Sequence, residues 1–118
     1  MVNVERLKTL REFLVKHEDR FDYGTFCSEL GLKSFGDMLH TCGTVACVGG
    51  WALALFCPHM SSAYSFEGAA CDSLGLNRDQ RDFLFYGDEK FGFPVLDLDT
   101  ATIQDALDRI DFLIKEAV

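Results

Sequence analysis

The sequence predicts an all-α protein, in which about five helices form a single bundle around a central apolar helix. Three observations lead to this fold class. Residues 44–57 (TVACVGGWALALFC) form a run without charge or proline, as expected of a helix that is buried on all sides. Segments near both ends of the chain repeat apolar residues every three or four positions, which is typical of amphipathic helices. The length of 118 residues, of which 48% are hydrophobic, fits one domain spanning residues 1–118.

The N-terminal part of the chain predicts one clear helix and one short one. Asn3 is expected to cap a helix that continues to about residue 16, because its side chain can accept from a free N–H group of the first turn. The apolar stripe of this helix is Val4, Leu7, Leu10, Phe13 and Leu14. Between residues 21 and 35, glycines punctuate the apolar anchors, so only a short helix at residues 26–30 is expected.

The central helix is expected to begin at Thr44, whose hydroxyl would act as the N-cap, and to end before Pro58. Cys47 then falls at about the third helical position. Gly49 and Gly50 each disfavour a helix by about 1 kcal/mol relative to alanine, so they indicate that a neighbouring helix approaches closely. The run of about 14 residues is too short for a bilayer, which takes about 20. We therefore expect a core helix and no membrane contact.

The second half of the chain predicts three further helices, at residues 66–74, 78–86 and 101–117. Asn77 is expected to cap the middle one, with Gln80 at the capping-box position. Asp99 or Thr100 is expected to cap the last one. The buried stripe of the last helix is expected to be Ile103, Leu107, Ile110, Leu113 and Ile114. The side chains expected to face water on this helix are Asp105, Asp108, Arg109 and Asp111.

Charge and cysteine content restrict the partners and the compartment. The net charge is −8, and residues 67–118 carry five basic and twelve acidic side chains. This balance disfavours direct nucleic-acid binding, which needs clustered lysine and arginine, and is compatible with a basic partner or with solubility alone. The N-terminus lacks the apolar block of a signal peptide. A cytoplasmic location is therefore expected, where the five cysteines would be reduced.

Residues 42–52 read Cys-Gly-Thr-Val-Ala-Cys-Val-Gly-Gly-Trp-Ala. This stretch resembles a signature, Cys-Gly-Thr-x-x-Cys-x-x-Gly-Trp-Ala, of a set of small bacterial and phage proteins whose function is unassigned. The similarity extends to about residue 86 and covers somewhat over a third of the chain. The resemblance implies a stand-alone helical domain, often linked to a phage or prophage, and it implies no particular activity.

Cys42 and Cys47 are the strongest candidates for chemistry, and four interpretations apply to them. They can fill space in the core, or form a disulfide if their Cα atoms lie within roughly 7 Å. With His40 they supply only three of the four ligands that zinc takes. A cysteine in the first turn of a helix can also gain thiolate character, but it needs a base, and only His17, His40 and His59 are available. We favour core packing, and expect neither a metal nor a cofactor. Trp51 is likewise expected in the core.

The acidic C-terminal half suggests a binding surface. Its candidate residues are Phe91, Phe93, Asp97, Asp99, Asp105, Asp108 and Asp111. Such a surface can occupy a nucleic-acid site on another enzyme, although a solvated helix face explains the same pattern. We therefore expect a non-enzymatic interaction protein, in the form of a phage-linked inhibitor of a host protein. The alternatives are a cysteine-dependent redox or hydrolytic site at Cys42 and Cys47, and a homodimer formed through leftover apolar surface.

Overall fold

The computed structural model describes residues 2–24, 36, 39, 45–58 and 66–117, with the backbone alone at residues 66–68. The described part of the chain is helical, and it contains two isolated β-bridges in place of strands. The elements are α1 (Val4–Lys16), the 3-10 helix η1 (Glu18–Arg20), α3 (Val48–Phe56), α4 (Phe66–Leu74), α5 (Arg78–Phe85) and α6 (Ile103–Ala117). The predicted all-α fold class is confirmed. The short helix expected at residues 26–30 lies outside the described residues.

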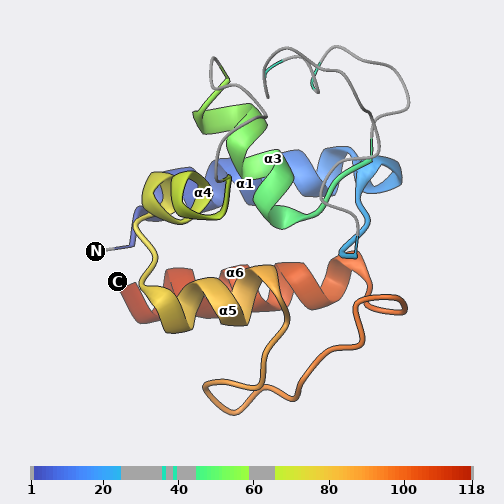
Figure 1. Cartoon of the computed structure of the whole chain (residues 1–118), viewed down its shortest axis with the longest axis vertical. Helices are drawn as coiled ribbons and strands as arrows, with labels where there is room; N and C mark the ends of the chain where they lie inside the picture. The colour runs from blue at the N-terminus through green and yellow to red at the C-terminus, as the bar shows by residue number, and fades with distance from the viewer. Residues whose placement is uncertain (1, 25–35, 37–38, 40–44, 59–65, 118) are drawn as a thin grey trace.

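The helices pack as two pairs that α1 joins. α3 packs against α4, and α5 packs beside α6, which runs antiparallel to it (Figure 1). α1 contacts α3, α4 and α6. The fully buried side chains at the centre come from every helix except η1, and the largest are Leu7, Leu10, Leu14, Trp51, Leu53, Leu74, Phe83, Leu84, Arg109, Ile110 and Leu113. No helix in the described part of the chain is both long enough and apolar enough to cross a membrane.

The central apolar helix is shorter than predicted. α3 is buried from Val48 through Ala54, as a helix with no charged side chain requires. It begins at Val48 with Cys47 as its N-cap residue, so the predicted start with a cap at Thr44 is wrong, and so is the helical position predicted for Cys47. The reason is a contact distant in sequence. The N–H of Ala46 donates to the Arg20 carbonyl, and the Ala46 carbonyl accepts from the N–H of Asp22, both at 3.1 Å.

Gly49 faces a neighbouring helix, as the glycine pair predicts, but at an ordinary packing distance. A Cβ atom at this position would lie 3.6 Å from the ring of Phe85 at the end of α5. That distance is ordinary van der Waals contact. A Cβ atom would therefore fit at this position, and the contact between α3 and α5 does not require glycine. α3 ends at Phe56, two residues before Pro58.

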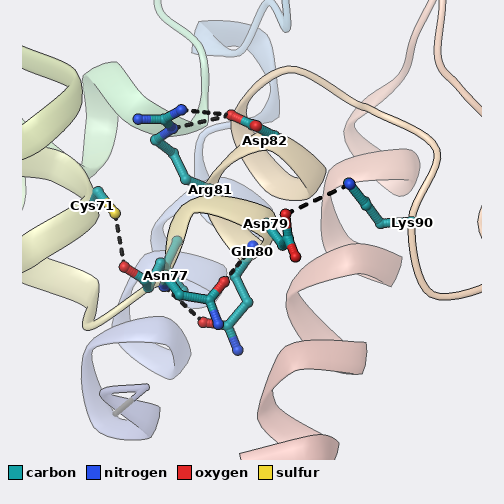
Figure 2. Close-up of polar contacts among 8 residues, drawn as sticks. Cys71, Asn77, Asp79, Gln80, Arg81, Asp82 and Lys90 are labelled. Carbon is teal, nitrogen blue, oxygen red and sulfur yellow. Dashed lines mark hydrogen bonds and ion pairs between the residues drawn. The ribbon is translucent and has the colours of Figure 1, made fainter.

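Two of the predicted helix caps are confirmed. The side chain of Asn3 accepts from the N–H of Arg6 at 3.1 Å. At the start of α5, Asn77 and Gln80 each accept from the other's backbone N–H at 2.9 Å, which completes the capping box (Figure 2). Both caps join residues three positions apart, so the local sequence is enough to specify them.

The cap predicted for the last helix is wrong. α6 begins at Ile103, and Thr102 stands before it. The carboxylate of Asp105 accepts from the backbone N–H of Thr102 at 2.8 Å, and the Thr102 hydroxyl accepts from the N–H of Asp105 at 3.4 Å. The preceding Asp99 and Thr100 instead belong to a turn. Threonine followed three residues later by an acid satisfies the same free N–H groups as a capping box.

Candidate functional site

Arg109 of α6 is buried, whereas the helical pattern predicts that it faces water. Only 1% of the Arg109 surface is exposed to solvent. The guanidinium donates three hydrogen bonds to backbone carbonyls, to Phe83 at 2.6 Å, Asp88 at 2.9 Å and Pro94 at 2.5 Å. Phe83 lies in α5, and the other two carbonyls belong to the connection between α5 and α6. A buried carbonyl needs a donor, and Arg109 supplies one to three carbonyls at once.

The surroundings of Arg109 are aromatic and contain no direct carboxylate partner. Its guanidinium lies over the ring of Phe83 at 4.6 Å and near that of Phe93 at 5.5 Å. No ion pair to it occurs among the residues that the structure describes. Burial lowers the pKa of Arg109 from its ordinary value, and the nearby Tyr23 and Asp105 oppose that shift. Arginine nevertheless remains charged in proteins, so a buried cation holds the connection between α5 and α6.

The Arg109 loop, defined as residues 86–97, extends away from the end of α5 and then turns back toward the start of α6 (Figure 1). Gly87, at φ +68°, accepts at its carbonyl from the N–H of Leu96 at 2.8 Å, which closes the base of the loop. A Cβ atom at Gly87 would lie 2.7 Å from the Leu96 Cβ atom, so only glycine fits. Lys90 in the loop pairs with Asp79 of α5 at 3.6 Å (Figure 2).

Phe91 occupies a strained position at the tip of this loop. The N–H of Phe93 donates to the Lys90 carbonyl at 2.9 Å, which makes Phe91 and Gly92 the two central residues of a tight turn. Their φ angles are +54° and +87°. Such turns favour asparagine and glycine, and the left-handed conformation costs most other residues about 1 to 2 kcal/mol. A phenylalanine held in this conformation is a reason to look for a function there.

Four phenylalanines form an aromatic cluster around this turn: Phe83, Phe91, Phe93 and Phe112. The ring centroids of five of the six pairs lie 5.1 to 5.6 Å apart. Phe91 stacks on Phe112 with 26° between the ring planes, and is still 48% exposed. Phe93 is predicted to be an exposed contact residue, but it is half-buried in the cluster beside Arg109. The cluster therefore presents Phe91 outward.

Most of the predicted acidic contact residues have structural contacts. Asp111 pairs with Arg11 of α1 at 2.6 Å, and Asp105 caps α6. The side chain of Asp97 accepts from the backbone N–H of Asp99 at 3.0 Å. Asp108 is exposed and accepts from Gln104 at 2.8 Å, one helical turn before it. Asp97, Asp99, Asp108 and Asp111 are nevertheless exposed, whereas Asp105 is half-buried.

Cys47 does not have the features of an activated nucleophile. Burial raises the pKa of its thiol, and Asp22 raises it further, while the backbone N–H groups of Gly50 and Gly49 oppose the shift without overcoming it. Cys47 is a free thiol, as are Cys57 and Cys71. Cys47 and Cys57 lie at the N-cap and C-cap of α3, at opposite ends of the helix.

The remaining predicted ligands and bases lie mostly outside the described residues. These are His40, Cys42 and His59. His17 is the C-cap residue of α1, and its ring lies 4.6 Å from that of Phe13. Within the described part of the chain, no three histidine, cysteine or acidic side chains are grouped so that they could hold a metal ion.

We expect Cys47 to react slowly with iodoacetamide in the native protein near pH 7. A raised pKa leaves less thiolate at a given pH, and the thiolate is the reactive form. The labelling rate should rise as the pH approaches the raised pKa, or when the protein is unfolded. Peptide mapping by mass spectrometry would assign the label to Cys47. Labelling of Cys47 at neutral pH faster than that of Cys71 would instead support the cysteine-dependent site.

The fold and the loop define a small all-α protein whose most unusual feature is a surface loop anchored by a buried arginine. A comparison of the chain with models of known protein families, with curated proteins and with solved structures finds no match in any of the three.

Proposed function

We propose that the protein is a non-enzymatic interaction module that binds a partner protein with the outer face of the Arg109 loop. One observation carries the proposal. Phe91 is half exposed at the loop tip, in a conformation that phenylalanine adopts at a cost, while the base of the loop is held by three hydrogen bonds from Arg109. Aromatic side chains in such positions are typical anchors of protein interfaces.

The anchoring of the loop supports binding because it reduces the entropy lost on association. A loop that must become ordered in a complex loses affinity, whereas one already held in place does not. Val95, four residues after Phe91, is 65% exposed. The loop therefore offers two apolar side chains on a segment whose backbone is already fixed.

The charge around the loop supports a basic partner. Exposed carboxylates in the loop or within two residues of it include Glu89, Asp97 and Asp99, and Lys90 is paired with Asp79. A negative surface speeds encounter with a positive one and selects against acidic partners. Following the resemblance to phage and bacterial proteins, we propose that the partner is a host protein with a basic site, which the module would occupy as an inhibitor.

Affinity capture from a bacterial lysate tests the proposal with matched variants. Phe91→Asn keeps a residue that tolerates positive φ and removes the aromatic ring. Glu89→Gln removes one exposed charge within the loop itself. We expect Phe91→Asn to retain at least threefold less of the specific partner, because a good aromatic anchor is worth more than about 1 kcal/mol. Glu89→Gln should retain less of it at low salt, where exposed charges are least screened.

Two control variants lie on α1, outside the loop. Val15→Ala shortens an apolar residue that is 44% exposed, and Glu12→Gln removes an exposed charge. Both should retain the partner at the level of the unmodified protein. Equal capture by Phe91→Asn and the unmodified protein, or capture of nothing specific by either, would reject this function.

A further inference from the structure

A hollow of about 310 Å³ opens beside the exposed ring of Phe91. The described residues that line it are Gln80, Phe91, Phe112, Leu113 and Glu116. This volume is at the small end of the range for ligand sites, so it suits one long side chain of a partner better than a cofactor.

The lining combines aromatic walls with a single charge. Phe91 and Phe112 form a stacked pair with centroids 5.3 Å apart. Glu116 is the only charged residue among the lining residues, and no ion pair engages it within the described part of the chain. It lies in the last turn of α6, where the free carbonyls of the helix end add negative potential.

We propose that this hollow receives an arginine side chain of the partner protein, an inference that rests on the proposed function. The aliphatic stem would lie against the phenylalanine rings, and the guanidinium would pair with the Glu116 carboxylate. Lys90, the only basic residue of the loop, pairs with Asp79 at 3.6 Å and not with Glu116.

Arginine fits this hollow better than lysine for two reasons. Its planar guanidinium stacks on aromatic faces, whereas the lysine ammonium is a compact and strongly hydrated charge. It also pairs with a carboxylate through two parallel hydrogen bonds. This protein already holds arginine against phenylalanine elsewhere, with Arg109 over Phe83 at 4.6 Å and Arg6 over Phe56 at 5.3 Å.

The test uses a blocked tripeptide, acetyl-Gly-Arg-Gly-amide, and needs no knowledge of the partner. The peptide is titrated into the ¹⁵N-labelled full chain while backbone amide shifts are followed. We expect saturable shifts at the five lining residues and weaker binding of the lysine peptide. The citrulline peptide, which has nearly the same shape without the charge, should cause no saturable shift.

Glu116→Gln should weaken the arginine peptide about fivefold, the upper range for an exposed ion pair, while Glu12→Gln on α1 changes the net charge equally and should leave the affinity unchanged. Shifts spread over the surface, equal binding of the lysine or citrulline peptide, or an unaffected Glu116→Gln variant would each overturn the arginine site. In that case the affinity capture would still decide whether the protein is an interaction module. Conversely, saturable binding of the arginine peptide with no partner captured from the lysate would reject the interaction module and support the arginine site.

Discussion

Replacing Arg109 with leucine should lower the free energy of unfolding by about 3 to 5 kcal/mol. The guanidinium donates to the carbonyls of Phe83, Asp88 and Pro94, and a buried carbonyl left without a donor costs about 1 to 3 kcal/mol. A buried ion pair can be exchanged whole for apolar side chains at little cost, but these acceptors belong to the backbone and remain in every variant. We expect part of the loss to be recovered because the loop can detach and become hydrated.

Urea denaturation followed by circular dichroism measures this effect. Arg11→Leu is the matched control, because Arg11 forms an exposed pair with Asp111 at 2.6 Å, and such pairs contribute up to about 1 kcal/mol. Arg109→Lys keeps the charge but not the planar fork, so it should fall between leucine and the unmodified protein. If Arg109→Leu costs no more than Arg11→Leu, the guanidinium does not anchor the loop.

Local patterns in the sequence predicted the features that depend on neighbouring residues. The Asn77–Gln80 capping box and the Asn3 cap each join residues three apart, so a short window contains both partners. The start of α3 does not depend on such a window. Ala46 stays outside the helix because it pairs with Arg20 and Asp22, residues that no local pattern connects to it. A local window does not contain this contact, so the sequence predicts a cap at Thr44 instead.

The candidate site was predicted only in part, for a similar reason. Phe91 is named as a contact residue from the sequence, together with Phe93, because aromatic residues in an acidic segment can contribute to a binding surface. The sequence predicts that Arg109 is exposed, because helical periodicity places charged residues on the solvent side. Periodicity contains no information about the carbonyls of Asp88 and Pro94, which need a hydrogen-bond donor. One signal was present: Arg109 lies three residues after Ala106 and four before Leu113, and both are buried. An arginine on that side of a helix must find acceptors within the fold.

Trp51→Ala should cost about 3 to 5 kcal/mol of unfolding free energy, the range for truncating a large buried aromatic. Trp51 is fully buried in α3 and lies 4.8 Å from the Phe13 ring. Its indole N–H donates to the Arg20 carbonyl at 2.8 Å, and the Arg20 guanidinium lies over the indole at 4.7 Å. The side chain therefore fills the core and also holds the segment after α1 against α3.

Trp51→Phe separates these two contributions. Phenylalanine keeps most of the apolar burial but cannot donate to Arg20, and a hydrogen bond of this kind contributes about 0.5 to 1.5 kcal/mol. The phenylalanine variant should therefore lose much less stability than the alanine variant. Trp51 is the only tryptophan, so unfolding has to be followed by circular dichroism. Phe91→Asn is the control for loss of an aromatic side chain at the surface, and should cost less than about 1 kcal/mol. A Trp51→Ala variant as stable as Phe91→Asn would contradict a buried Trp51, and with it the central position of α3.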